Sequence, residues 1–252
     1  MTTAILSALA QEQSGLLAAL QQPVRTQHAG RSFSSGVLHG QPVVLALSGI
    51  GKVAAATTAS ALIERFGATR IVFTGVAGGV GDAVNVGDVV VAGSYVQHDM
   101  DASPLFARWL VPGYAHACLP CDGDLSALLS GAASAYLASV SGLFDINSGT
   151  AAPRLHHGLM ASGDRFINCP EVANALRAPL LAAGHNVLAV EMEGAAVAQV
   201  CMDYGVAFAA MRTISDRADA TAHVDFARFI NTVASRYADH IVRNLLQSLP
   251  KQ

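Results

Sequence analysis

Two glutamates flank a single methionine in the stretch Glu191-Met192-Glu193, which is followed by Gly-Ala-Ala. The apolar run before it, Asn186–Val190, favours a strand, and the small residues after it favour a helix. In open α/β sheets, ligands bind beyond the carboxyl ends of the strands, where such junctions lie. Because burying a carboxylate is costly unless the charge is paired or used, this motif indicates a functional site.

Two more acids are expected at the same edge. Glu12 follows the first strand-like run, and Asp216 follows the run Val206–Arg212. With Glu193, they place three carboxylates just past strand ends, an arrangement that suits a cationic transition state served by a general acid and a general base. Structural alternatives remain open. Glu12 could be an acid that the helix dipole favours in a first turn, and Asp216 could cap the turn that follows it.

Strand-like and helical runs alternate along the chain and must position these acids. Strands are expected at Ala4–Leu9, Pro42–Ser48, Arg70–Thr74, Asp88–Gly93, His157–Ser162, Val187–Val190 and Val206–Arg212. Helices are expected at Glu12–Leu20, Lys52–Phe66, Leu125–Leu137, Val172–Ala182, Glu193–Tyr204 and Phe226–Leu246. Arg31–His39 and Pro42–Ala46, separated by Gly-Gln, are expected to form a hairpin. The pattern predicts an α/β fold over residues 1–252: a single-domain three-layer sandwich with a central mixed, mostly parallel twisted sheet flanked by helices.

Two glycine clusters follow predicted strands, but neither is a nucleotide motif. The cluster 49–52 (Gly-Ile-Gly-Lys) lacks the earlier glycine of a phosphate loop, and Val53 replaces the Ser or Thr that binds magnesium. The cluster 75–81 departs from the dinucleotide pattern. Glycines after strands still let a ligand approach backbone amides, so we expect both clusters to line one crevice.

Composition limits the classes of protein that this chain can be. With 52% hydrophobic and 13% charged residues, it can form a large core, and little surface charge remains, which favours a subunit interface. A net charge of −3 without a basic cluster argues against a nucleic-acid partner. The segment Leu125–Phe144 is uncharged, but serine and glycine dilute it, so a soluble helix is expected and no membrane partner. The absence of a basic leader and the presence of only four cysteines predict a cytoplasmic protein.

Cysteine and histidine give weak signals. Cys118 and Cys121 have C-x-x-C spacing, but no second pair accompanies them and their loop is rich in proline and glycine, so a structural role is favoured. His98 stands beside Asp99 and Asp101, and one histidine next to alternating acids is weak evidence for a metal site.

Six motifs together resemble a known family. They are Ser48-Gly-Ile-Gly-Lys-Val-Ala-Ala55, Thr74-Gly-Val-Ala-Gly-Gly79, Val86-Gly-Asp-Val-Val90, Ser162-Gly-Asp-Arg-Phe-Ile167, Val190-Glu-Met-Glu193 and Ser215-Asp216. Their order and spacing closely resemble the 5′-methylthioadenosine/S-adenosylhomocysteine nucleosidases of the purine nucleoside phosphorylase-like superfamily, over nearly the whole chain. The resemblance implies hydrolysis of the N-glycosidic bond of a 5′-substituted adenosine to release adenine, with no metal and no cofactor.

The resemblance also implies catalytic roles. Asp216 would protonate the purine at N7, and Glu12 would activate the attacking water, which Arg212 helps to place. Glu193 would hold the ribose hydroxyls, with Met192 packed under the sugar. Asp216, rather than asparagine, favours a 6-aminopurine, because a carboxylic acid can donate to N7 and accept from the exocyclic amine.

Further substrate contacts are implied for two groups of residues. Phe166 and Ile167 would receive the base, and an apolar pocket for the 5′ substituent would be formed by Leu9, Ile50 and Phe226. Val76, Gly78 and Ser215 complete the expected substrate-binding set. Met192, Phe166 and Phe226 could otherwise be ordinary core residues, and Glu191 is interpreted as a structural partner for an arginine or a backbone group.

Water rather than phosphate is the expected nucleophile. Phosphorylases of this superfamily carry arginines for phosphate after the first strand and near the middle glycine motif, whereas 8–20 and 75–88 contain none here. Two features depart from the nucleosidase pattern: Val76 replaces the usual serine, and the loop Pro104–Trp109 differs. The family implies a homodimer in which the 100–114 loop lies near the partner's site. Alternatives are a purine nucleoside phosphorylase, a nucleosidase for another 5′-modified purine nucleoside, or a catalytically silent nucleoside-binding homologue.

Overall fold

The computed structural model describes residues 1–140, 152–219 and 222–250. Its strands are β1 (Thr2–Ser7), β2 (Gln21–His28), β3 (Arg31–Leu38), β4 (Gln41–Leu47), β5 (Ala68–Gly79), β6 (Val89–Gln97), β7 (Leu119–Pro120), β8 (Leu155–Ser162), β9 (Val187–Glu191) and β10 (Ala207–Asp216). Its helices are α1 (Ala10–Ala19), α2 (Lys52–Phe66), α3 (Gly123–Val140), α4 (Pro170–Ala182), α5 (Gly194–Tyr204), α6 (Ala222–Phe229) and α7 (Ser235–Ser248). Ile230–Ala234, between α6 and α7, form a π-helical turn.

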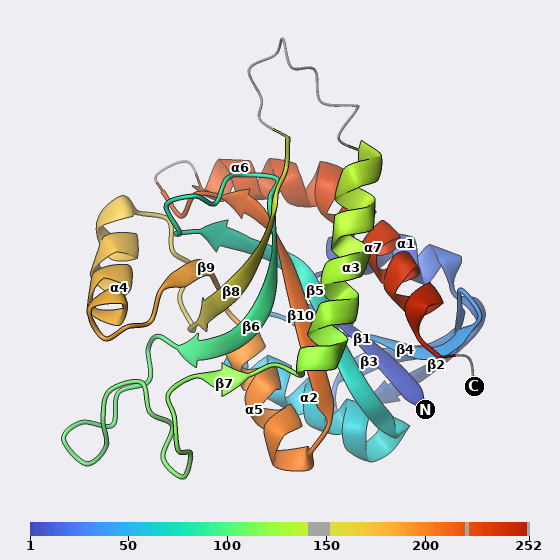
Figure 1. Ribbon diagram of the computed structural model, residues 1–252. Coiled ribbons are helices and arrows are strands. Elements are labelled where there is room, and N and C mark those ends of the chain that lie inside the picture. The colour runs from blue at the N-terminus through green and yellow to red at the C-terminus, as the bar shows by residue number, and fades with distance from the viewer. Residues whose placement is uncertain (141–151, 220–221, 251–252) are drawn as a thin grey trace.

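The strands form one sheet that closes on itself in part. Its order is β10-β6-β8-β9-β5-β1-β4-β3-β2, and an additional pairing joins β10 to β5. Five strands thus form a closed ring, and β1, β4, β3 and β2 extend from it as an open wing (Figure 1). β1, β5 and β10 run parallel, so their carboxyl ends meet at one edge.

Alternating side chains of the strands supply a core on each face of the sheet. In β1, Ala4 and Leu6 join one core while Ile5 joins the other. The first core is covered by α2 and α5, whose buried faces consist mainly of alanine and other small residues. The second is covered by α1, α3 and α7, which lie on the opposite side in Figure 1. This three-layer α/β arrangement confirms the predicted class and holds the strand ends in place.

The sheet is mixed, as predicted, but parallel pairs do not outnumber antiparallel ones among the described strands, so the expectation of a mostly parallel sheet is corrected. Antiparallel pairs join β10 to β6, β2 to β3, β3 to β4, β5 to β9 and β6 to β7 among the described strands. The alternation of strands and helices did not predict β2, nor the closing contact between β10 and β5. The expected hairpin is confirmed, since β3 pairs with β4 in antiparallel register.

One expected helix differs from the prediction, and one other expected helix agrees with it. Phe226–Leu246 was expected to be one helix, but the π-helical turn separates α6 from α7. The uncharged segment Leu125–Phe144 forms most of α3, and its last residues, 141–144, lie outside the described part of the chain. Within residues 1–140, 152–219 and 222–250, no helix combines the length and apolar character that a membrane span requires.

Candidate active site

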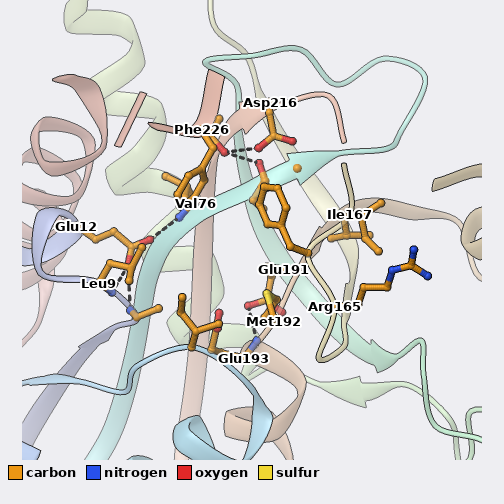
Figure 2. Close-up of a pocket in the computed structure, with 17 residues that line it drawn as sticks. Leu9, Glu12, Val76, Arg165, Ile167, Glu191, Met192, Glu193, Asp216 and Phe226 are labelled. Carbon is orange, nitrogen blue, oxygen red and sulfur yellow. Dashed lines mark hydrogen bonds between the residues drawn. The ribbon is translucent and has the colours of Figure 1, made fainter. Parts of the chain in front are cut away.

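One cavity lies where the carboxyl ends of β1 and β10 approach the junction of β9 with α5 (Figure 2). With the open space at its mouth, it encloses about 610 Å³. Its lining consists of Ala8, Leu9, Glu12, Ile50, Val76, Ala77, Gly78, Arg165, Phe166, Ile167, Val190, Glu191, Met192, Glu193, Ser215, Asp216 and Phe226. Every residue predicted for the site except Arg212 is in this set. Both glycine clusters contribute to it, as expected for one crevice.

Glu12 is buried and held by three backbone amides. Its Oε2 accepts hydrogen bonds from the N–H groups of Ala8 at 2.9 Å and Leu9 at 2.8 Å, and its Oε1 accepts one from Val76 at 3.0 Å. Burial raises the pKa of this carboxyl, although the charge of Arg212 and the three amides act in the opposite direction. Glu12 therefore caps the first turn of α1 and also faces the cavity, so a structural role in the helix and a role in the site are compatible.

Two glycines of β5 make room for the acids. A Cβ on Gly75 would lie 2.7 Å from Oε1 of Glu12, and a Cβ on Gly78 would lie 3.0 Å from Oδ1 of Asp216. Both distances are shorter than ordinary van der Waals contact, so the carboxylates approach the strand only because these positions lack side chains. Two glycines of this cluster therefore leave the space that the two carboxylates occupy.

Glu191, which lines the cavity, forms a buried ion pair with Arg212, which does not. Nη2 of Arg212 lies 2.6 Å from Oε2 of Glu191, and the two side chains are 1% and 2% exposed. Glu191 also accepts hydrogen bonds from the backbone N–H of Gly194 and from the Ser162 hydroxyl. The Arg212 guanidinium packs over the Phe73 ring, 3.9 Å from its centroid. These contacts confirm that Glu191 is a partner of both an arginine and backbone groups, and they explain why Arg212 does not line the cavity.

Glu193 occupies the N-cap position of α5, and its side chain crosses to another element. Its Oε1 accepts a hydrogen bond from the Gly51 N–H at 2.9 Å, just before α2. Burial and the nearby Glu191 raise the pKa of Glu193, against the lowering effect of Arg212. A carboxyl with this raised pKa can exchange hydrogen bonds with hydroxyl groups as either donor or acceptor.

Asp216 is held in place by its neighbours in the chain. Its Oδ2 accepts a hydrogen bond from the Ser215 hydroxyl at 2.7 Å, and its Oδ1 accepts one from the Ala218 N–H at 2.8 Å. The turn-capping contact considered from the sequence is therefore present. The carboxyl is nevertheless part of the cavity wall, at the side opposite Glu193 in Figure 2.

Aromatic and aliphatic side chains form the rest of the wall. The Phe166 and Phe226 rings meet edge to face, with centroids 5.8 Å apart and planes at 74°. Leu9, Val76 and Phe226 pack against Phe229 and Ile230 in a small apolar cluster. Val76 therefore presents methyl groups and its backbone N–H beside Glu12, with no hydroxyl.

Sequence reasoning missed five lining residues: Ala8, Ala77, Arg165, Val190 and Glu191. Ala8 and Ala77 lie between predicted residues, and Arg165 directly precedes Phe166 in the motif 162–167, so adjacency could have indicated them. Arg165 is the one arginine of the described lining, and in Figure 2 its side chain extends away from Glu12 and Glu193. The cavity thus offers no pair of guanidinium groups among its described residues for a phosphate dianion.

Comparison with known proteins agrees with this geometry. The phosphorylase superfamily model matches residues 2–247. A 5′-methylthioadenosine/S-adenosylhomocysteine nucleosidase of Mycobacterium bovis is 35% identical over 99% of this chain and 97% of its own length. The crystal structure of the same kind of nucleosidase from Neisseria meningitidis, in complex with methylthio-immucillin-A, superimposes with a TM-score of 0.86. It is 34% identical and covers 98% of this chain and 99% of its own.

A futalosine hydrolase of Helicobacter pylori is also similar, with a TM-score of 0.84 and 29% identity over 99% of this chain and 98% of its own. The fold and the site define a member of the phosphorylase superfamily. Within it, this chain belongs to the 5′-methylthioadenosine/S-adenosylhomocysteine nucleosidase family, whose members are N-glycosyl hydrolases.

Proposed function

We propose that residues 1–252 act as one domain that hydrolyses 5′-methylthioadenosine or S-adenosylhomocysteine and releases adenine. The observation that carries the proposal is the convergence of Glu12, Glu193 and Asp216 on one cavity. The relatives' names supply the substrate class.

Departure of adenine needs a proton, because adenine is a poor leaving group as an anion. Asp216, fixed by Ser215 and the Ala218 N–H, is the proposed general acid at purine N7. The neutral base then leaves while positive charge develops on the ribose.

Stabilisation of this charge falls to Glu193. Its carboxyl, anchored by the Gly51 N–H, is proposed to hold the ribose hydroxyls, and Met192 packs under the sugar. Hydrogen bonds between this carboxyl and the ribose hydroxyls that strengthen as positive charge develops stabilise the transition state more than the ground state.

The attacking water is assigned to Glu12. Its Oε2 already accepts two amide hydrogen bonds, whereas Oε1 accepts the single bond from Val76. Oε1 thus has remaining capacity to accept a water proton. Arg212 is proposed to help place this water, acting from behind the wall through Glu191.

The base and the 5′ substituent are assigned to the apolar wall. Phe166 and Ile167 would receive adenine by stacking and backbone hydrogen bonds. Leu9, Ile50 and Phe226 would surround the 5′ group, with Val76, Gly78 and Ser215 completing the contacts.

We also propose a cytoplasmic homodimer in which the 100–114 loop lies near the partner's site. Support comes from this loop, which projects from the body of the fold between β6 and β7 (Figure 1). Leu105 and Phe106 in it are adjacent and 84% and 43% exposed, so a partner subunit that covers the loop would bury apolar surface.

A second candidate is hydrolysis of another 5′-modified purine nucleoside, since a futalosine hydrolase is among the similar structures. Val76, which replaces the serine usual in the nucleosidases, supports this candidate, because it contacts both Glu12 and the apolar cluster proposed to surround the 5′ group.

A nucleoside panel tests the proposal. Methylthioadenosine, S-adenosylhomocysteine, adenosine and futalosine are incubated with the protein, with and without phosphate, and base and sugar products are quantified. Phosphate-independent adenine release, fastest from the two thio-nucleosides, supports the proposal. Ribose-1-phosphate formed only with phosphate would indicate a phosphorylase. Preferential cleavage of futalosine would indicate the second candidate, and binding without cleavage would indicate a catalytically silent homologue.

A further inference from the structure

Three charged residues outside the lining of the cavity form a closed set of contacts. Nζ of Lys52 lies 2.5 Å from Oδ1 of Asp99 and 4.0 Å from Oδ2 of Asp164. Asp164 accepts the Lys52 backbone N–H at 2.8 Å and donates its own N–H to Oδ2 of Asp99 at 2.9 Å. The three residues come from the start of α2, the segment after β6 and the loop after β8. This set of contacts therefore joins segments that are distant in the sequence.

Two of the joined segments carry parts of the site. Gly51, the residue before Lys52, donates the hydrogen bond that anchors Glu193. Phe166 and Ile167, which line the cavity, come two and three residues after Asp164. Lys52 itself is not in the lining of the cavity. Any effect of Lys52 on a ligand must therefore pass through these neighbours.

The ammonium group is well placed to hold this set of contacts together. The Lys52 side chain is 18% exposed, against 33% for Asp99 and 50% for Asp164, and it also donates to Oε1 of Gln97 at 3.2 Å. Burial opposes ionisation of Asp99. Hydrogen bonds from Lys52 and from the Asp164 N–H outweigh this effect, so the pKa of Asp99 is lowered and the contacts stay ionic.

We propose that Lys52 is a positioning residue of the active site. By bridging Asp99 and Asp164, it fixes the loop that presents Phe166 and Ile167 to the base, and it fixes the Gly51 N–H that orients Glu193. The inference rests on the proposed function for the identity of the ligand. Since small displacements of substrate-positioning groups cost large factors in rate, removal of the bridge is expected to affect binding of the purine more than stability.

The test is Lys52→Met, which keeps the aliphatic stem and removes the charge. The KM for methylthioadenosine and the Kd for adenine, measured by calorimetry, are expected to rise together by about tenfold, with a smaller change in kcat. The Tm is expected to change by less than about 2 °C, as for a partly exposed ion pair. Lys52→Arg is expected to recover most of the lost affinity, because it restores a cation within reach of both carboxylates.

Two further variants separate positioning from general structure. Asp99→Asn is also expected to raise the KM. The double variant Lys52→Met/Asp99→Asn is expected to have a KM only slightly above that of Lys52→Met, because the two residues act as coupled partners. Arg243→Met removes another partly exposed ion pair, with Asp239, and should leave KM and adenine affinity unchanged. An unchanged KM and adenine affinity in Lys52→Met would overturn the inference. An equal loss of adenine affinity in Arg243→Met would also overturn it. A wild-type protein that binds adenine but cleaves no nucleoside would instead refute the proposed function.

Discussion

Arg212 and Glu191 lie 2.6 Å apart in the interior, and their pairing divides the two glutamates of the Glu-Met-Glu motif into different roles. Glu191 is fully engaged by Arg212, Ser162 and the first amide of α5. Glu193, two residues on, reaches across to Gly51. The motif therefore combines a structural acid with one that can face a substrate.

This division predicts opposite outcomes for matched substitutions. Glu191→Gln leaves the buried Arg212 without a counter-charge and should destabilise the protein by about 3–5 kcal/mol. Glu193→Gln keeps a group that can accept the Gly51 N–H and should retain most stability, while adenine release falls by about 10²-fold or more. Urea unfolding and initial rates measure both quantities. Equal stability losses in the two variants would contradict the division.

Asp216→Asn tests the general acid. Asparagine can still accept the Ala218 N–H and can donate to Ser215, so the fold should persist, while adenine release falls by about 10²–10⁴-fold. A riboside with a nitrophenolate leaving group, which needs no proton to depart, should restore most of the rate. Asp124→Asn, at an exposed position in the first turn of α3, is the control. A well-folded Asn variant with normal adenine release would exclude the assignment.

The sequence predicted which residues line the cavity better than it predicted the sheet, and the reasons are physical. Glu12, Glu193 and Asp216 each follow an apolar run, so their place at strand ends follows from local pattern. β2 was missed because most of its side chains are exposed and it lacks the alternation of a half-buried strand. The pairing of β10 with β5 is a tertiary contact that no local pattern encodes. Arg212 lies outside the lining of the cavity because it pairs with Glu191 of another strand. Its position close to Ser215-Asp216 in the sequence could not indicate this pairing.

The raised pKa of Glu12 predicts two pH effects. As a base, Glu12 must be ionised, so kcat/KM should fall on the acid side at a pH above the ordinary carboxyl value of 4.5. For stability, the unfolded chain ionises first as pH rises past 4.5, so wild type loses stability between that pH and the raised pKa of the folded state. Glu12→Gln removes this loss and should become more stable relative to wild type as pH rises through that window.

Thermal or urea unfolding of Glu12→Gln and wild type between pH 4 and pH 8 measures the stability effect, and initial rates measure a loss of activity of about 10²–10⁴-fold. Glu64→Gln, which removes an exposed carboxylate of α2, is the control and should show neither change. A stability difference that is independent of pH would mean that Glu12 has an ordinary pKa in the folded protein.

The close approach of Gly75 to Glu12 predicts the effect of a single methyl group. In Gly75→Ala the new Cβ would lie 2.7 Å from Oε1 of Glu12, so the carboxylate must move from the position where it accepts the Val76 N–H. We expect kcat to fall by about 10²-fold, because a displaced base cannot reach the attacking water. Gly131→Ala is the matched control, since it adds the same methyl group to an exposed position in α3 with no atom within 4 Å. That variant should keep full activity and gain about 0.5–1 kcal/mol of stability from helix propensity. Full activity in Gly75→Ala would show that Glu12 tolerates displacement and would count against its role as the base.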